Sequence, residues 1–442
     1  MTLPTYGEYT YSGVEWLGSA PSHWRIAPLW TLFRRTKRTG FQDDQLLSVY
    51  RDYGVVPKAS RDDNNNKPSD DLSLYQLVEP GDLAINKMKA WQGSVAISDY
   101  RGIVSPAYFV YGATHSEDAR FLHYLLRSPR YITGYLSISK GIRVNQWDLE
   151  PQYHSRMPVL LPDKKEQTAI AAFLDRETAK IDALIAEQEK LIDLLAEKRQ
   201  ATISHAVIRG LDPDAPMKDS GVAWLGEMPA HWATRPLKSV SRIGNGSTPN
   251  RDNSLYWDDD GFPWLNSSVV NQDEVFEAER FVTPLALKEC HLPIVIPPAL
   301  LVGITGQGKT RGMATRLAFT ATINQHVAYV KPDEKVLGEK YLLRVLESAY
   351  EHLRTESDAA GSTKGAITCE QLGQLKLPFP DLNEQMQIAA FLDRESGKLD
   401  ALAGDAERAT MLLKERRAAL IAAAVTGKVD VRATVAQTEE VA

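Results

Sequence analysis

The chain has 442 residues, of which 43% are hydrophobic and 24% charged, and its 51 basic and 57 acidic side chains give a net charge of −6. This length predicts more than one domain, and this composition excludes a disordered or fibrous chain. The two cysteines, Cys290 and Cys369, exclude a disulfide scaffold, and without Cys-x-x-Cys or His-rich spacing they predict no metal site.

No leader or membrane segment is expected. The amino terminus lacks a basic stretch followed by an apolar run, and Pro297 and Pro298 interrupt the longest apolar stretch. A membrane span needs roughly 20 apolar residues. We therefore expect a cytoplasmic protein that makes no membrane contact.

The sequence contains one pattern written twice. Residues 12–24 (SGVEWLGSAPSHW) recur at 220–232 (SGVAWLGEMPAHW), and residues 166–184 (EQTAIAAFLDRETAKIDAL) recur at 384–402 (EQMQIAAFLDRESGKLDAL). The segments between these phrases differ strongly. A variable segment on a repeated frame predicts two related domains that read different ligands. The histidines in the repeated Pro-x-His-Trp phrase are expected to shape each domain rather than to catalyse.

The first domain is expected within residues 1–160. Turn signals followed by short apolar runs predict strands near 82–85, 93–97 and 102–111, and residues 121–128 predict a helix. The stretch from 119 to 147 holds five basic residues and no acid, beside Ser, Asn and Gln, which is typical of phosphate and base-edge contacts. The candidate DNA contacts of this half are Lys87, Lys89, Ser105, Lys140, Arg143, Asn145 and Gln146.

A long helix is expected within residues 161–211. Asp163 at the N-cap with Glu166 three residues later is a capping-box arrangement, and a helix from 163 to 208 would be about 69 Å long. Apolar residues follow at near-heptad spacing with charged flanks, as in a coiled coil. The residues predicted for this seam and for subunit docking are Ile170, Phe173, Leu174, Ile181, Leu184, Leu191 and Leu195.

The second domain is expected within residues 212–378, with a helix near 341–353 and an acid-free basic stretch from 299 to 332. Residues 303–310 (GITGQGKT) satisfy the phosphate-loop pattern, but Gly312 is a poor start for the helix that such a loop needs. The candidate DNA contacts of this half are Lys309, Arg311, Arg316, Asn324, Gln325, Ser362, Thr363 and Lys364.

A second long helix is expected within residues 379–427, followed by a flexible tail at 428–442. Its cap is Asp381, and its predicted seam and docking residues are Ile388, Phe391, Leu392, Leu399 and Leu402. Two such helices in one chain predict an antiparallel coiled coil that spaces the domains and docks partners. A stalk that only fills space is the simpler alternative.

These phrases together resemble the specificity (S) subunits of type I restriction–modification enzymes. The resemblance covers nearly the whole chain and includes EPGDLAINKMKAWQG, GIVSPAY, IGNGSTP and TINQ beside the two duplicated phrases. It implies an α/β (α+β) fold with two similar target recognition domains, each reading half of a split DNA sequence, joined by two long helices that form an antiparallel coiled coil.

The resemblance also implies partners. The helices would dock two methyltransferase (M) subunits, which carry S-adenosylmethionine, and restriction (R) subunits would add ATP- and Mg²⁺-dependent cleavage of double-stranded DNA. The chain itself would be non-catalytic, without a cofactor or metal. Two other readings stay open: a coiled-coil adaptor whose variable domains bind proteins, and a P-loop NTPase at 303–310.

Net charge is unevenly distributed. Residues 1–160 carry +2, 161–220 carry −3, 221–378 carry −2 and 379–442 carry −3. The recognition domains together are therefore neutral, and the helix-bearing segments hold the acidic excess. This distribution predicts that the chain alone binds DNA weakly and that docked partners supply part of the grip.

Overall fold

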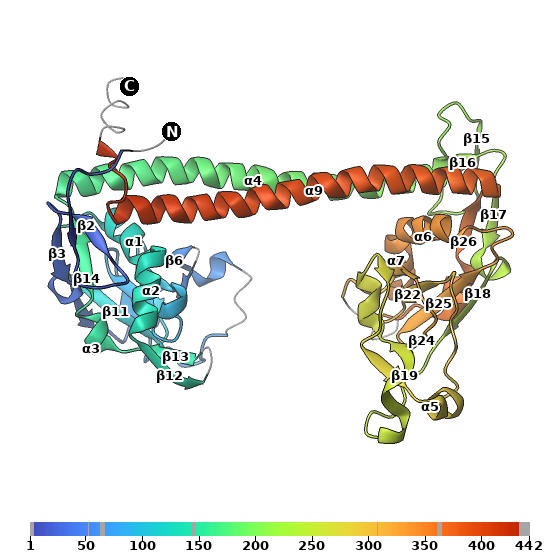
Figure 1. Ribbon diagram of the computed structural model, residues 1–442, viewed down its shortest axis with the longest axis horizontal. Helices are drawn as coiled ribbons and strands as arrows, with labels where there is room; N and C mark the ends of the chain where they lie inside the picture. Colours follow the sequence, from blue (N-terminus) through green and yellow to red (C-terminus); the bar gives the residue numbers. More distant parts are fainter. Residues whose placement is uncertain are drawn as a thin grey trace. The chain divides into compact units, whose positions relative to one another are not determined.

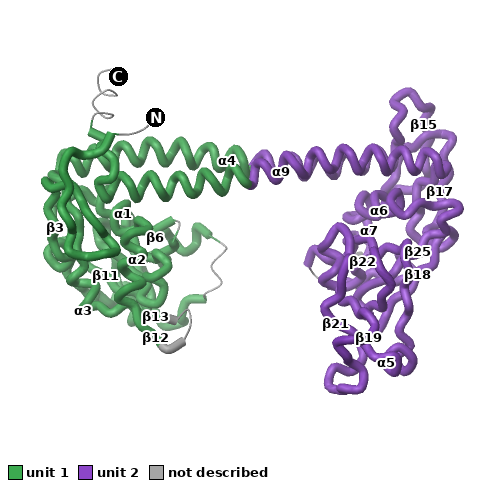
Figure 2. The backbone as a smooth tube through the Cα atoms, in the orientation of Figure 1, with its two compact units in different colours: residues 1–189, 408–442 green, residues 190–407 purple. Residues whose placement is uncertain are grey.

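The computed structural model describes residues 4–51, 53–61, 67–143, 146–306, 308–359 and 365–432 (Figure 1). Contacts divide the chain into two compact units, with residues 1–189 and 408–442 in unit 1 and residues 190–407 in unit 2 (Figure 2). Each unit holds one globular domain and part of each long helix, α4 (Lys164–Arg209) and α9 (Leu382–Val425). Over these described ranges, no helix is both long and apolar enough to cross a membrane.

The domain of unit 1 is built on an antiparallel sheet with helices packed on it. The strand order in the sheet is β4 (Phe33–Thr36), β11 (Tyr108–Ala113), β8 (Leu83–Asn86) and β9 (Val95–Ile97). Further pairs are β1 (Tyr9–Tyr11) with β2 (Ser19–Pro21), β3 (Arg25–Pro28) with β14 (Pro158–Leu161), β5 (Leu47–Tyr50) with β6 (Gly54–Pro57), β7 (Gln76–Val78) with β10 (Gly102–Val104), and β12 (Ser139–Arg143) with β13 (Gln146–Leu149). The helices are α1 (Ala119–Arg127), α2 (Pro129–Ser137) and α3 (Pro151–His154).

Helix α1 shows why these elements form. Its N-cap residue, Asp118, accepts hydrogen bonds from the backbone N–H groups of Arg120 and Phe121, which satisfies two otherwise unpaired donors. Phe121, Leu122, Leu125 and Leu126 lie on the buried face of the helix, at the spacing of helical turns. Pro129 then starts α2 at a position where no N–H is needed.

The domain of unit 2 repeats the sheet order of unit 1. Its strands run β18 (Ser241–Asn245), β25 (Val327–Pro332), β22 (Leu300–Gly303), β23 (Ala314–Leu317) and the added β20 (Glu274–Val275). A second sheet joins β21 (Arg280–Val282), β19 (Trp257–Leu265) and β24 (Thr322–Ile323). The other elements are β15 (Met217–Asp219) with β16 (Glu227–Pro229), β17 (Ala233–Pro236) with β26 (Lys376–Phe379), α5 (Pro284–Glu289), α6 (Glu339–Ser348), α7 (Tyr350–Ala359) and α8 (Cys369–Gln374).

The expected fold class, two similar α/β (α+β) domains with paired long helices, is confirmed. The structure differs in detail from the expected elements. Residues 102–111 form two strands, because Pro106 lies between them, and the helix expected at 341–353 is divided into α6 and α7 at Ala349.

The two long helices run antiparallel. In unit 1, Arg417 Nε donates to Asp182 Oδ1 at 2.8 Å and Lys414 Nζ donates to Glu189 Oε1 at 3.2 Å. In unit 2, Arg199 Nε lies 3.4 Å from the Oδ1 atom of Asp400. Partner numbers on α9 fall as those on α4 rise, which confirms the antiparallel pairing. Buried positions alternate by three and four residues along both helices, as in a heptad seam.

Most of the predicted seam residues are buried. Leu184, Leu191 and Leu402 are the exceptions, with exposed fractions of 51%, 41% and 53%. In each case the seam passes through the following residue of the helix instead. Ile185, which follows Leu184, is buried. Phe391 is partly buried, and the other predicted positions are buried: Ile170, Phe173, Leu174, Ile181, Leu195, Ile388, Leu392 and Leu399.

The repeated phrases meet where each long helix begins. Asp163 and Asp381 cap the helices by accepting the N–H groups of Glu166 and Glu384, at 2.9 and 2.8 Å. The Glu166 carboxylate accepts from Tyr6 Oη at 2.6 Å, and His23 Nε2 and Trp24 Nε1 lie 2.9 and 3.2 Å from it.

The same contacts recur in unit 2. Glu384 Oε2 lies 3.0 Å from His231 Nε2 and accepts from Trp232 Nε1 at 2.9 Å. The Pro-x-His-Trp phrase therefore fastens each domain to its own helix, which is the structural role expected for its histidines.

The carboxyl-terminal residues complete unit 1. Of the tail expected at 428–442, residues 428–432 are described, and the rest lies outside the described residues. Val431 is fully buried in the core of unit 1, and Asp430 N donates to Pro4 O at 2.7 Å. Residues 428–432 therefore contribute to the packing of this unit.

Candidate nucleic-acid interface

Three loops meet at one end of the central sheet in each unit. In unit 1 they are the β8–β9 loop, the turn before β11 and the β12–β13 hairpin. Lys87 N donates to Ala107 O at 3.2 Å, and Leu149 N donates to Lys87 O at 2.9 Å, so backbone hydrogen bonds join all three. The rings of Trp91 and Trp147 pack at 4.8 Å between centroids. The predicted candidates Lys87, Lys89 and Ser105 therefore lie in one region.

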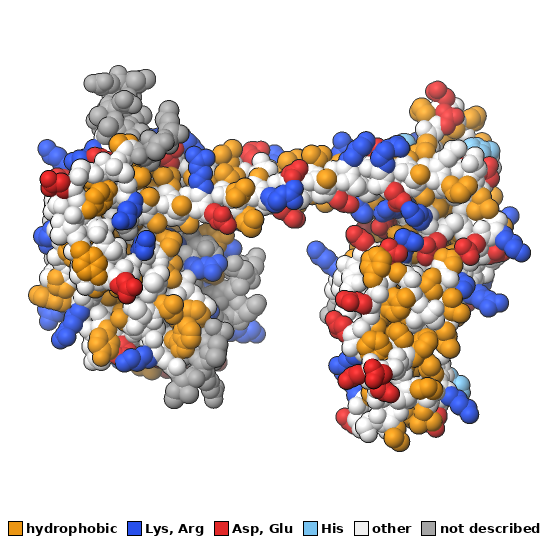
Figure 3. All heavy atoms as spheres, in the orientation of Figure 1, with side chains coloured by type: hydrophobic (Ala, Val, Ile, Leu, Met, Phe, Trp, Pro, Cys, Tyr) orange, Lys and Arg blue, Asp and Glu red, His pale blue; other side chains and the backbone are white. Residues whose placement is uncertain are grey.

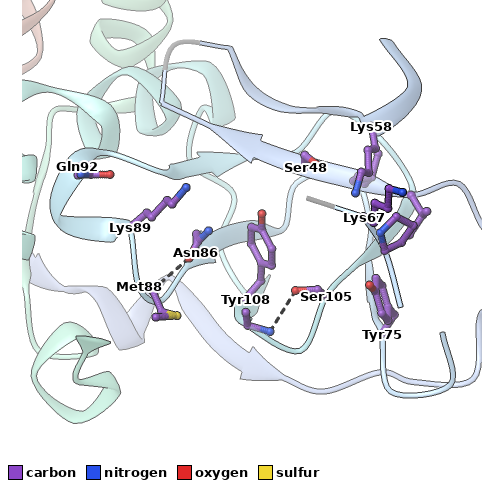
Figure 4. Close-up of a pocket in the computed structure, with 14 residues that line it drawn as sticks. Ser48, Lys58, Lys67, Tyr75, Asn86, Met88, Lys89, Gln92, Ser105 and Tyr108 are labelled. Carbon is purple, nitrogen blue, oxygen red and sulfur yellow. Dashed lines mark hydrogen bonds between the residues drawn. The ribbon is translucent and has the colours of Figure 1, made fainter. Parts of the chain in front are cut away.

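A pocket of about 570 Å³ opens beside these loops (Figure 4). Figure 4 shows Lys58 and Lys67 on one side of it and Lys89 on the other, with Asn86 and Tyr108 between them. No acidic side chain is among the described residues that line it. Burial raises the pKa of Tyr108, so its hydroxyl stays protonated at neutral pH. Such a lining suits a phosphate with a neighbouring polar ring.

The pocket contains residues that the charge pattern did not point out. Lys58 and Lys67 lie outside the acid-free stretch of the sequence, in segments that also contain aspartates. Their common position depends on the β5–β6 hairpin folding against the β8–β9 loop, which is a tertiary contact. No local signal in the sequence identifies such a pair.

Two other predicted lysines of unit 1 have acidic neighbours. Lys87 Nζ lies 3.9 Å from Asp148 Oδ2, and Lys140 Nζ lies 3.4 Å from Glu150 Oε1. Both pairs are partly exposed, so water and salt screen them. Asn145 lies outside the described residues, as do the side chains of Arg143 and Gln146.

Unit 2 places its corresponding loops at the same end of the sheet, and the phosphate-loop pattern is one of them. Gly303 N donates to Met313 O at 2.9 Å and Gly312 N donates to Gly303 O at 2.8 Å, which closes a β-hairpin between β22 and β23. A Cβ atom on Gly303 would lie 2.2 Å from Thr310 O, so glycine is required for this hairpin. In the described residues, 303–310 lead into a strand and not a helix. The P-loop NTPase reading is therefore wrong.

Three predicted DNA contacts of unit 2 have structural partners instead. Arg311 is only 4% exposed, and its Nη1 donates to Asp358 Oδ1 at 2.7 Å, a hydrogen bond that lowers the pKa of Asp358. Arg316 pairs with Glu274 and Glu339. Asn324 is 4% exposed and accepts from the N–H of His326. Sequence alone could not show this for the two arginines, because their acidic partners come from other segments.

The remaining candidates of unit 2 are distributed differently. Lys309 and Gln325 are exposed, whereas Ser362, Thr363 and Lys364 lie outside the described residues. Lys309 O accepts from Tyr350 Oη at 2.8 Å, which orders the hairpin loop that carries this lysine.

Gln325 belongs to a chain of four polar side chains from three loops, which we call the Gln325 chain. Thr248 Oγ1 donates to Gln325 Oε1 at 2.5 Å, Gln325 Nε2 lies 3.1 Å from His326 Nε2, and His326 Nδ1 lies 2.7 Å from Thr305 Oγ1. Two of these loops pack closely at Gly246. A Cβ atom there would lie 1.7 Å from Ile323 O, so this approach requires glycine. The roles of Thr248 and Thr305 were not foreseen.

A metal centre has no support in the part of the chain that the structure describes. No group of three or more His, Cys, Asp or Glu side chains there could hold an ion. The described loops carry lysine ammonium groups, amides, hydroxyls and aromatic rings, which suit recognition of a polyanion.

Comparison with known proteins shows what this chain is similar to. Residues 229–403 match the type I restriction modification DNA specificity domain. The specificity subunit of the Escherichia coli enzyme EcoR124I/EcoR124II is 22% identical over 258 residues, which are 58% of this chain and 59% of that subunit. The MjaIX specificity subunit of Methanocaldococcus jannaschii is 28% identical over 172 residues, 38% of each chain. The chain thus spans about half the length of the curated relatives it matches.

Solved structures share the fold. A chain from a study of complex assembly and conformational transition of the type I R-M system covers 93% of this chain and 99% of its own length, with 19% identity and a TM-score of 0.64. The HsdS subunit from Thermoanaerobacter tengcongensis covers 93% and 98%, with 19% identity and a TM-score of 0.50. At 19% identity, these likenesses show a shared fold.

Proposed function

We propose that this chain is the DNA-recognition subunit of a type I restriction–modification system and that each unit reads one half of a split DNA sequence. The observation that carries the proposal is the match of residues 229–403 to a DNA specificity domain. This match lies within one of two units whose central sheets share a strand order. The loops rich in lysine, amide and hydroxyl groups meet at the same end of that sheet in both units.

The two kinds of side chain divide the work of recognition. Lysines such as Lys58 and Lys89 neutralise backbone phosphates, which orients the protein on the duplex without reading sequence. Amides and hydroxyls such as those of Asn86 and Gln325 form hydrogen bonds to base edges. Basic and acidic side chains are scattered among uncharged ones on the visible face of both units (Figure 3).

The long helices supply the other half of the proposal. Leu184, Leu191 and Leu402 lie outside the buried seam, so their apolar side chains are accessible to a partner. We infer that methyltransferase subunits dock there and that restriction subunits join the complex. Those partners would bind S-adenosylmethionine, ATP and Mg²⁺, so this chain acts without a catalytic group of its own.

Neutralising the pocket lysines tests the proposal. Lys58→Gln and Lys89→Gln are each expected to weaken binding to a mixed-sequence duplex and to reduce the slope of log K against log salt by about 1 per lysine. The slope falls because a variant that makes one fewer phosphate contact displaces fewer counterions from the DNA when it binds. Fluorescence anisotropy of a labelled duplex across a salt series, with the full chain alone and with a methyltransferase subunit, measures both quantities.

Lys165→Gln is the matched control. Lys165 is exposed at the start of α4, outside the pocket lining, and carries the same charge. It should leave the slope unchanged. Equal slopes for all three variants and the parent chain would remove the pocket from the interface, and an absence of DNA binding by the parent chain with its partner would favour the protein-adaptor reading.

A further inference from the structure

The Gln325 chain is ordered at a surface where water could satisfy the same groups. Gln325 and His326 are exposed, and Thr248 and Thr305 are partly exposed. Fixing these side chains costs rotamer entropy, and a hydrogen bond that replaces one to water returns little. The Gln325 chain therefore contributes little to the free energy of unfolding of unit 2. Its effect is to hold the Gln325 amide in one orientation before any ligand arrives.

The hydrogen bonds assign that orientation. Thr248 Oγ1 donates to Oε1 of Gln325, so the NH₂ end of the amide faces His326 and donates to its Nε2. A ring nitrogen that accepts carries no proton, so the neutral ring carries its proton on Nδ1 and donates it to Thr305 Oγ1. One lone pair of Gln325 Oε1 and one of its N–H bonds therefore have no partner among the described residues.

We propose that Gln325 reads an adenine in the half-sequence recognised by unit 2. An amide with one free acceptor beside one free donor matches the major-groove edge of adenine, where N6 donates and N7 accepts. Guanine presents two acceptors on the same edge and so leaves the amide oxygen unpaired. This inference rests on the proposed function, and it adds the base and the residue. Thr248 and His326 act as positioning residues for the amide.

Gln325→Glu is the direct test. A glutamate at this position has acceptors only, so it pairs with the N4 amino group of cytosine and not with N7 of adenine. Selection from a randomised duplex pool by the full chain with its methyltransferase subunit gives the preferred sequence. We expect one position to change from adenine to cytosine, and affinity for the parental sequence to fall by about 5- to 150-fold.

Two further variants separate reading from folding and from charge. Gln272→Glu introduces the same charge at an exposed glutamine outside the Gln325 chain and should keep the parental sequence preference. Thr248→Val removes one support of the amide, so discrimination at the same position should weaken without a change in the preferred base.

The outcomes are distinct. A parent chain that selects a split sequence, with Gln325→Glu selecting the same one, overturns the adenine assignment and leaves the proposed function intact. The adenine assignment is also overturned if the positions that the Gln325→Glu variant alters are not adenine in the sequence selected by the parent. The proposed function is then still intact. A parent complex that selects no sequence overturns both.

Discussion

Replacing Glu166 with alanine is expected to destabilise unit 1 by about 3–5 kcal/mol, because it leaves buried hydrogen-bond donors without an acceptor. The Glu166 side chain is only 2% exposed and meets Tyr6, His23 and Trp24. Burial, reinforced by this carboxylate, raises the pKa of Tyr6 far above its usual value, so the Tyr6 hydroxyl always donates. Without Glu166, Tyr6 and Trp24 lose their acceptor inside the fold.

The repeat in unit 2 provides the matched comparison. Glu384 has two such partners, and its side chain is 25% exposed, so Glu384→Ala should cost about 1–3 kcal/mol because water reaches the freed donors. Hydrogen exchange of the full chain, followed on α1 for unit 1 and on α6 for unit 2, reports each unit separately. Equal losses of protection in the two variants would show that burial of the carboxylate does not set its contribution.

Acid is expected to destabilise unit 1 by about 4 kcal/mol between pH 7 and pH 5 through two buried histidines. Burial lowers the pKa of His154 to about 3, and burial together with Arg127 lowers the pKa of His123 to about 4. Both values lie below the 6.5 of an exposed histidine, so the unfolded chain binds more protons. The stabilisation is complete above pH 6.5 and falls as pH drops toward these folded-state values.

The surroundings of the two rings explain why they stay neutral. His123 Nδ1 lies 3.3 Å from the Ile97 carbonyl oxygen, and Arg127 Nη1 lies 2.7 Å from its Nε2, so the second nitrogen must accept. His154 is fully buried beside Tyr111, and its Nε2 has no hydrogen-bond partner among the residues that the structure describes. Protonation would place a charge against a guanidinium in one case and in an apolar core in the other.

A double variant isolates this effect. His123→Gln keeps a donor and an acceptor, and His154→Phe keeps a ring of similar size, so neither group titrates. Exchange protection of α1 in the full chain, corrected for the intrinsic rate at each pH, should fall between pH 7 and 5 more steeply in the parent than in the double variant, in which His115, whose pKa burial also lowers, still titrates. An equally steep loss in both would place the acid sensitivity elsewhere.

Features set by local sequence were predictable. The caps at Asp163 and Asp381, the antiparallel helix pair and the two similar domains follow from short-range patterns and from the repeat. The seam was slightly misplaced because a leucine and an isoleucine occur at adjacent positions on α4, and only packing against α9 selects Ile185 over Leu184. Hydrophobic spacing alone does not distinguish such neighbours.

The interface was less accessible to sequence reasoning. A basic residue in an acid-free stretch looks available for DNA, yet Arg311 pairs with Asp358, 47 positions away along the chain, and Arg316 pairs with Glu274 and Glu339. The converse holds for Lys58, which joins the other lysines that line the pocket only through folding of the β5–β6 hairpin. Charge along the chain therefore indicates the region of the interface but not its individual contacts.

Mapping of methylated adenines in DNA from cells that carry this chain with its methyltransferase partner tests the central claim most directly. The parent should yield one split sequence, and replacing residues 233–378 with those of another specificity subunit should change one half of it while the other half stays the same. Methylated sites that share no sequence, or a replacement that changes neither half or both, would contradict the assignment of one half-sequence to each unit.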